Sequence, residues 1–270
     1  MARKKKVVEE PVVTYPRIIM GLDISTKCIG VCIVKDDGTS DKPEILKLTH
    51  VSPKVSRKIG DMESLFIRKN IFEDMIIKNV VESGITDVVI EEPLVSSNNA
   101  ITVSTLLRFN GMISESVYRI LGIVPNFISS YDARSYSFPE LISLRKYNKK
   151  GDEYPVEHIT KAIKKDNIVL FGSYPYDIDK KNVMMNLVND MYDGINWVID
   201  EKTGDFKKEN YDACDSLVCA LAYVNINHHG IEKPRIGSVE REDKDDSTVF
   251  KYTTVIWDRT YDKSLVLKKK

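Results

Sequence analysis

Short apolar runs near the start of the chain predict three consecutive β-strands joined by short turns. The run RIIMGLD begins at residue 17 and ends in an acid. The following STKCIGVCIVKDDG alternates between apolar and polar positions in its second half and then reaches an Asp-Gly turn signal. Residues 44–51, EILKLTHV, have the composition of a third strand. These three segments are the predicted first strands of a sheet.

After residue 60 the apolar residues recur with the spacing of a helix instead of alternating with polar ones as in a strand. Residues 61–82 place apolar side chains on one face of a long helix that Gly84 ends, and residues 102–121 repeat the pattern up to Gly122. The Val/Ile-rich run TDVVIEEP lies between the two helices, and IVPNFIS follows the second one. The order β-β-β-α-β-α-β predicts an α/β fold with a mixed five-stranded sheet flanked by helices.

The regular pattern weakens after residue 131, and the composition changes. Residues 134–165 carry eight basic residues against four acidic ones, with aromatic residues interleaved. Two helices are predicted over 179–193 and 210–225, and the last 40 residues hold a charged loop, EREDKDDS, a strand-like TVFKYTTVIW and a lysine tail. We therefore expect a flexible basic arm over 1–16, a core domain over 17–226 with a basic insertion at 134–178, and a C-terminal extension over 227–270.

Composition and charge restrict the class of protein. The 270 residues include 40 Lys+Arg and 40 Asp+Glu, so any basic surface has to be local. No apolar run approaches the length of a membrane span, and the first residues lack the apolar region of a secretory signal. The four cysteines do not have zinc-site spacing, and we expect them to be core residues in a reducing compartment. The expected location is the cytoplasm.

Four acidic residues lie where the predicted elements would bring them to one edge of the sheet. Asp23 ends the first strand, and Glu91 ends the strand after the long helix. Asp212 and Asp215 begin the last core helix about one turn apart. Strands that are parallel neighbours deliver their terminal side chains to the same edge, where α/β proteins place their sites. Taken singly, each acid also fits a turn former or a helix cap.

The four acids together favour a metal site. Crowded carboxylates repel one another, and a hard cation such as Mg²⁺ or Mn²⁺ with oxygen ligands relieves that repulsion. Two such ions about 4 Å apart can activate a water and stabilise a leaving oxyanion in phosphodiester hydrolysis. The set therefore predicts a two-metal hydrolytic centre.

The same segments resemble a known family, the RuvC-like Holliday junction resolvases of the RNase H-like superfamily. GLDISTKCIGV resembles the first strand and turn of that family, and VVIEEPL resembles its glutamate strand. DACDSLVCALAY resembles its paired-aspartate helix. The resemblance places the family's glutamate at Glu91, with Glu92 as the fallback, and its paired aspartates at Asp212 and Asp215.

A fourth motif in the correct order extends the resemblance over roughly residues 17–226. DKKNVMMNLV resembles the segment that carries a basic residue near the scissile phosphate, which falls at Lys180 with Lys181 as second choice. The family's other active-site lysine has no clear counterpart, and Arg134 is only a candidate for it. Ser216 stands where alanine is usual, and the chain is longer than the family's pattern. These departures affect the expected junction selectivity more than the expected chemistry.

The resemblance implies an RNase H-like fold and a metal-dependent, structure-selective endodeoxyribonuclease that acts on four-way DNA junctions in recombination and repair. Asp23 would bridge two Mg²⁺ ions, for which Mn²⁺ can substitute, and the other three acids would complete their ligand shells. Lys180 would balance the charge that develops on the phosphate. Symmetric cleavage of a junction implies a homodimer. The expected DNA-binding residues are Arg134, Arg145, Lys146, Lys149, Lys150 and Lys181.

Other interpretations remain open at this point. A branched-DNA or flap nuclease of the same fold would have a broader substrate range, and a junction-binding protein of the same fold would not cut at all. The basic stretch fits a solvated loop and helix as well as a DNA-binding surface. Actin-like ATPases and sugar kinases share the first motif but need further glycine-rich phosphate loops, and the chain has only 13 glycines. A DnaQ-type exonuclease needs an acid where Ser25 stands.

Overall fold

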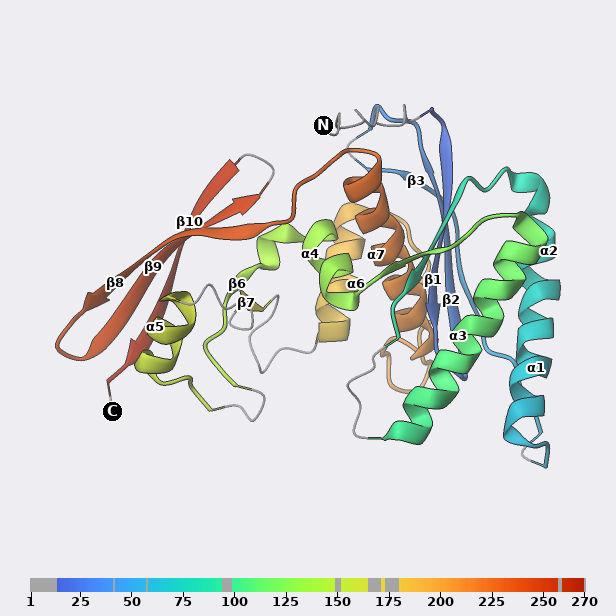
Figure 1. The fold of residues 1–270 in the computed structure, drawn as a ribbon, viewed down its shortest axis with the longest axis horizontal. Helices are drawn as coiled ribbons and strands as arrows, with labels where there is room; N and C mark the ends of the chain where they lie inside the picture. Colours follow the sequence, from blue (N-terminus) through green and yellow to red (C-terminus); the bar gives the residue numbers. More distant parts are fainter. Residues whose placement is uncertain are drawn as a thin grey trace, which may run out of the picture.

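A five-stranded sheet with helices on both faces forms the larger part of the molecule (Figure 1). The strands lie in the order β3-β2-β1-β4-β5; β2 is antiparallel to β1 and β3, and β4 and β5 run parallel to β1. Their bounds are Arg17–Ile24 (β1), Ile29–Asp36 (β2), Glu44–Val51 (β3), Asp87–Glu91 (β4) and Asn126–Ile128 (β5). The predicted α/β fold with a mixed five-stranded sheet flanked by helices is confirmed.

The structure is a computed structural model. It describes residues 14–40, 42–56, 58–93, 99–148, 152–164, 171–172, 180–256 and 259–269. Most of the predicted arm over 1–16 lies outside these residues, as does most of the second half of the predicted insertion. Among the helices described, none has the length and apolar character needed to cross a membrane.

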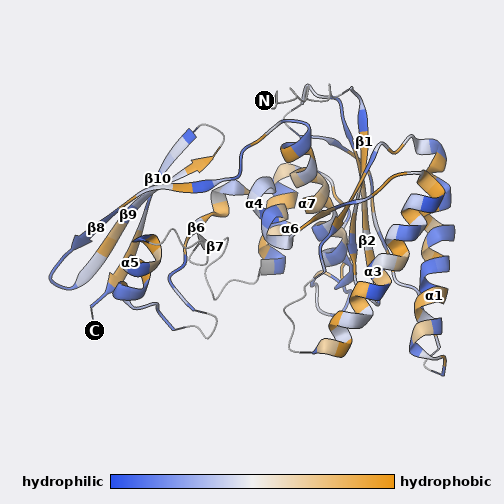
Figure 2. Cartoon of the chain, in the orientation of Figure 1, coloured by the Kyte–Doolittle hydropathy of each residue, from blue (hydrophilic) through white to orange (hydrophobic). Residues whose placement is uncertain are grey.

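The central strands are buried on both faces, which explains their nearly continuous apolar sequence. Met20 and Leu22 pack against the helices on one face, whereas Ile19 and Val34 pack against the helices on the other. Figure 2 shows the hydrophobic colour along most of β1 and β2. Two separate apolar clusters therefore hold the sheet between its helices.

The first face carries the two helices that the sequence predicted. A continuous helical segment comprises α1 (Asp61–Phe72), a π-helical turn η1 (Glu73–Ile77), α2 (Lys78–Val80) and a 3₁₀ turn η2 (Val81–Ser83). It ends at Gly84, whose φ of 67° lies in the left-handed region that glycine favours. The second helix, α3 (Ala100–Leu121), begins two residues before the predicted start because the Asn99 side chain caps it by accepting from the Ile101 and Thr102 N–H groups.

The opposite face is organised around a helix whose residues 216–224 are all buried. This helix is α7 (Glu209–Asn227), and it packs on β1 and β2 with α4 (Ser130–Ser137) and α6 (Lys180–Met191) beside it. A Cβ on Gly21 would lie 2.2 Å from the Ser216 carbonyl oxygen, and one on Gly30 would lie 1.9 Å from the Asp212 carbonyl oxygen. Two glycines therefore allow the helix backbone to rest directly on the backbone of the sheet.

A second, smaller unit is built from two distant segments, residues 139–172 and the C-terminal strands. The C-terminal strands β8 (Arg235–Asp243), β9 (Ser247–Ile256) and β10 (Arg259–Lys268) form an antiparallel sheet in the order β10-β9-β8. The 3₁₀ turn η3 (Pro139–Leu141), strand β6 (Ser143–Leu144), helix α5 (Val156–Lys164) and strand β7 (Phe171–Gly172) lie earlier in the chain. Leu144 and Ile159 pack against Phe250, Leu265 and Leu267 in a third apolar cluster.

Four expectations from the sequence change here. Residues 248–256 of TVFKYTTVIW are confirmed as strand, within β9, but β8 and β10 were not predicted. EREDKDDS is not a loop throughout, because residues 240–243 end β8 and only 244–246 form the turn. Lys268 ends β10 and is therefore not a free tail residue. Residues 134–137, at the start of the predicted insertion, belong to α4 and pack against α7. The domain boundaries stay a prediction.

Candidate metal centre

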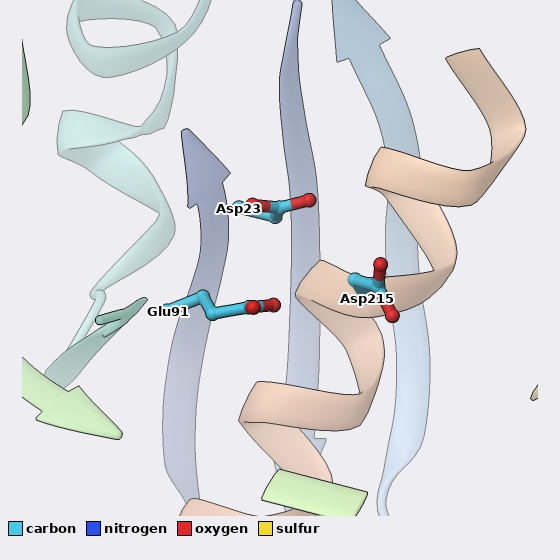
Figure 3. Close-up of side chains that lie close together, drawn as sticks. All are labelled: Asp23, Glu91 and Asp215. Carbon is cyan, nitrogen blue, oxygen red and sulfur yellow. The ribbon is translucent and has the colours of Figure 1, made fainter. Parts of the chain in front are cut away.

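Three carboxylates meet at the edge of the sheet where β1 and β4 end (Figure 3). Asp23 and Glu91 project from adjacent parallel strands, since Leu22 pairs with Ile90 one residue earlier. Asp215 projects toward them from α7. Oxygen atoms of the three side chains all lie within 4.8 Å of one another. This spacing allows one divalent ion to contact all three carboxylates.

Asp212 lies one turn before Asp215 in α7 and beside this group rather than inside it. Its negative charge contributes to the raised pKa of Asp23. The Cys28 thiol donates a hydrogen bond to the Asp212 carboxylate, and burial raises the pKa of this thiol to about 12, so it keeps its proton. The structure therefore brings all four predicted acids to one place, three of them within reach of a single ion.

The four acids have raised pKa values. Burial is the largest cause for each, followed for Asp23 by the charges of Glu91, Asp215 and Asp212. The pKa of Asp23 rises well above its usual value, and that of Glu91 rises to about 7. Burial and mutual repulsion thus outweigh the cations nearby. A hard divalent ion with oxygen ligands fits this donor set, because it would neutralise the excess negative charge.

Metal binding competes with protonation of the acids, so the stabilisation of the fold by metal should depend on pH. A carboxyl whose pKa is higher in the folded than in the unfolded state binds more protons when folded, so the free energy of unfolding falls as pH rises. For Glu91 this loss falls between pH 4.5 and about 7. Mg²⁺ needs the deprotonated carboxylates, so it is expected to raise the melting temperature more at about pH 8 than at about pH 5. Equal metal-induced shifts at both pH values, measured by thermal unfolding, would contradict this account.

Strand alternation separates the two neighbouring glutamates. The Glu91 side chain points into the acid group, whereas the Glu92 side chain is exposed and its N–H donates to the Ile128 carbonyl oxygen at 2.8 Å. The first choice made from the sequence, Glu91, is the one that the structure places with Asp23 and Asp215.

Two cations lie beside the acids. The Arg134 guanidinium, from α4, is 4.0 Å from an Asp215 carboxylate oxygen and is only partly exposed. Lys181, in the first turn of α6, lowers the pKa of all four acids, and its Nζ lies 5.0 Å from the centre of the Tyr211 ring. The side chain of Lys180 lies outside the described residues. The second choice for the basic residue, Lys181, thus lies near the acids, and the first choice, Lys180, stays a prediction.

Two other predicted DNA-binding residues, Arg145 and Lys146, lie away from the acids. Lys146 pairs with Glu153 at 3.1 Å, and Arg145 is partly buried with no hydrogen-bond partner for its Nε among the described residues. Both follow β6, in the segment that packs against the C-terminal sheet. Lys149 and Lys150 lie outside the described residues.

Sequence reasoning missed two neighbours of the acids. Cys28 was expected only as a core residue, and it is indeed buried and free like the other three cysteines. His50 was not singled out, although strand register brings it close, since Asp23 pairs with Gly30 and Gly30 pairs with His50. The charge of His50 lowers the pKa of Asp212. The signal was the position of His50 at the end of a strand, which is visible only once the strands are paired.

Comparisons with known proteins give a structural similarity at low sequence identity. No family model matches the chain, and no curated protein matches it. Thermus thermophilus RuvC aligns with a TM-score of 0.43 and 14% identity over 81% of this chain and 99% of that chain. The T. thermophilus RuvC complex with a Holliday junction substrate gives 0.44 and 10% identity over 79% and 96%. The Mn-soaked human cytomegalovirus terminase nuclease domain gives 0.32 and 11% identity over 82% and 90%.

Proposed function

We propose that this protein is a metal-dependent, structure-selective DNA endonuclease that resolves four-way junctions. The observation that carries the proposal is the convergence of Asp23, Glu91 and Asp215, with Asp212 beside them. Each acid comes from a motif that resembles RuvC-like resolvases, and the motifs occur in the family's order. Buried carboxylates that repel one another destabilise the fold, so their concentration here is best explained by a bound divalent metal.

The roles of the residues follow from their positions. Asp23, Glu91, Asp212 and Asp215 would hold two Mg²⁺ ions. Ions bound there would supply the Lewis acidity that activates a water and stabilises the leaving oxyanion. Arg134 and Lys181 lie beside the acids and would bind the phosphate and offset the negative charge that develops on it. Without metal the acid group repels the DNA backbone, so substrate positioning and metal binding would be linked.

We also propose that the nuclease acts as a homodimer, because two symmetric cuts in a junction require two sites. Exposed apolar side chains on the helices of the first face support this part of the proposal. They are Met62 and Phe66 of α1 and Ile101, Leu107 and Tyr118 of α3. Sedimentation of the purified protein at several concentrations would test it, and a monomer at all of them would remove the symmetric-cleavage model.

The activity is tested with a labelled mobile four-way junction, compared with a linear duplex and a flap of matched sequence in Mg²⁺. Paired symmetric nicks in the junction alone would support a junction resolvase. Additional cutting of the flap or the duplex would keep the chemistry and widen the substrate range. An absence of cutting in both Mg²⁺ and Mn²⁺, with DNA binding retained, would favour the non-cutting junction-binding protein.

A matched pair of substitutions tests which glutamate is the ligand. Glu91→Gln is expected to reduce cleavage by roughly a hundredfold or more, because it removes a charged metal ligand. It should also raise the melting temperature of the metal-free protein by removing a buried like charge. Glu92→Gln, on the exposed side of the same strand end, should leave both properties nearly unchanged. Similar losses of cleavage in the two variants would reject the assignment of Glu91.

Arg134 gives a second test of the proposed mechanism. Arg134→Gln is expected to lower the cleavage rate about a hundredfold, the usual effect of losing a cationic or hydrogen-bond donor from a transition state. Junction binding in Ca²⁺ should change much less, since one phosphate contact among many is lost. Arg145→Gln is the control, because Arg145 follows β6 rather than lying beside Asp215. A cleavage rate for Arg134→Gln equal to that of the control would exclude Arg134 from the site.

A further inference from the structure

A groove with a volume of about 770 Å³ lies between β3 and the segment that follows α6. One wall consists of β3 and the turn before it, and the other consists of residues 192–198. Asn210 and Ala213, in the first turns of α7, close one part of it. The volume is within the range of ordinary ligand pockets, which are roughly 300–1,000 Å³.

Hydrogen bonds hold the walls of the groove in place. The Tyr192 hydroxyl donates to the Pro43 carbonyl oxygen at 2.8 Å, which links the two walls. The Asn210 amide donates to the Val198 carbonyl at 2.6 Å and its oxygen accepts from the Val198 N–H at 3.1 Å. The Trp197 indole N–H donates to the Asn189 side chain at 2.5 Å, which fixes the orientation of the ring. The groove is therefore formed before any ligand binds.

The groove lies near the proposed metal centre, although none of the four acids lines it. Asn210 and Ala213 lie on either side of Asp212 in the first turns of α7. At the sheet, the lining residue His50 pairs with Gly30, which in turn pairs with Asp23. A DNA strand bound at the acids would therefore pass near the groove.

The chemistry of the lining favours a flat, uncharged ligand. Two lysines, Lys35 and Lys42, are balanced by three carboxylates, so the lining does not favour a phosphate group. The apolar contributors include Ile45, Leu48 and the partly exposed indole of Trp197. Hydrogen-bonding side chains such as those of Thr49, His50 and Asn196 lie among them. Aromatic stacking together with a few polar contacts is how proteins hold single nucleobases.

We propose that this groove holds one unpaired nucleobase of the DNA strand that is cut, stacked on Trp197. This inference rests on the proposed function and extends it to the recognition of the substrate. A branch point offers bases that are already unpaired or easily unstacked, whereas a continuous duplex has to be opened first. The groove would thus favour cutting at a branch by binding one unpaired base, without contacts to all four arms of the junction.

Photocrosslinking tests where the base lies. Junctions with 5-iododeoxyuridine at each position around the branch point are bound to the wild-type protein in Ca²⁺, irradiated and mapped by mass spectrometry. The expected result is a crosslink to Trp197 or Tyr192 from one position close to the cut. Crosslinks that map only to other parts of a protein that cuts the junction would overturn the proposal and leave the nuclease function intact. A protein that neither binds nor cuts DNA would reject both.

A substitution cycle tests whether the groove contributes to cleavage. Asn196 is exposed, so Asn196→Trp should fill the groove without disturbing the core, and Asn196→Ala is the matched control. An abasic nucleotide at the mapped position should slow cleavage about tenfold in the wild type and in Asn196→Ala, as expected for the loss of one stacked base. In Asn196→Trp the abasic nucleotide should have no further effect. An equal abasic effect in all three proteins would assign the effect to the DNA alone and overturn the proposal.

Discussion

Asp23→Asn is expected to lower the metal-dependent cleavage of a four-way junction by roughly a thousandfold or more. Asp23 is the acid that the charges of the other three all affect, and its raised pKa shows how crowded this position is. An amide is neutral and a poorer ligand for a hard cation, so the variant should lose metal affinity together with cleavage. Binding of the junction in the absence of metal should be retained or become tighter, because one negative charge near the DNA backbone is removed.

Two measurements separate this result from simple unfolding. The melting temperature of metal-free Asp23→Asn should rise, because the substitution removes a buried charge from a repelling group. Asp74→Asn, at an exposed position that pairs with Lys78, should leave cleavage unchanged and serves as the control. A variant at position 23 that cuts as fast as this control would remove Asp23 from the site.

Gly30→Ala is expected to cause the second large effect, although glycine has no chemistry of its own. The added Cβ would lie 1.9 Å from the Asp212 carbonyl oxygen and 2.7 Å from the Ala213 nitrogen, so the start of α7 has to move away from β2. Overpacking of this kind costs about 1–3 kcal/mol of stability. Misplacement of catalytic groups by about 1 Å costs roughly a hundredfold in rate, so cleavage should fall further than stability suggests.

Gly111→Ala is the control for this substitution. Gly111 lies in α3, and a Cβ there would meet nothing within 4 Å. Alanine in a helix interior should therefore stabilise the protein by up to about 1 kcal/mol without changing cleavage. If Gly30→Ala melted and cut like Gly111→Ala, α7 would not rest on the backbone of β2 in the way described. The comparison uses thermal unfolding and single-turnover cleavage for both variants.

The sheet and the acids could be predicted because their signals are local. Each core strand is a short apolar run, and each of the four acids lies at a predictable end of a strand or a helix. Parallel pairing of β1 and β4 then brings Asp23 and Glu91 to the same edge. The choice of Glu91 over Glu92 followed from the motif, and strand alternation gives it a physical reason.

The parts that could not be predicted depend on contacts between distant segments. The charged residues 240–243 were predicted as part of a loop, whereas pairing with β9 makes them the end of strand β8. Arg134 was only a candidate from the sequence, because its contact with Asp215 depends on the packing of α4 on α7. His50 reaches the acids through register across three strands. Lys181, the second choice from the motif, lies near the acids because α6 packs beside α7, and a motif match does not determine that packing.

The third apolar cluster has a consequence for the synthesis of the protein. Residues 143–164 leave the ribosome roughly 100 residues before β10 is complete, a delay of roughly 5–20 s at ordinary rates of translation. During that interval Leu144 and Ile159 lack the side chains of β9 and β10 that cover them in the finished fold. The exposed apolar side of the newly made α5 is therefore a surface that chaperones can bind during synthesis. A chain cut after α7 would keep that surface exposed permanently, so a shortened protein that keeps the five-stranded sheet would have to lose residues 143–164 together with the C-terminal sheet.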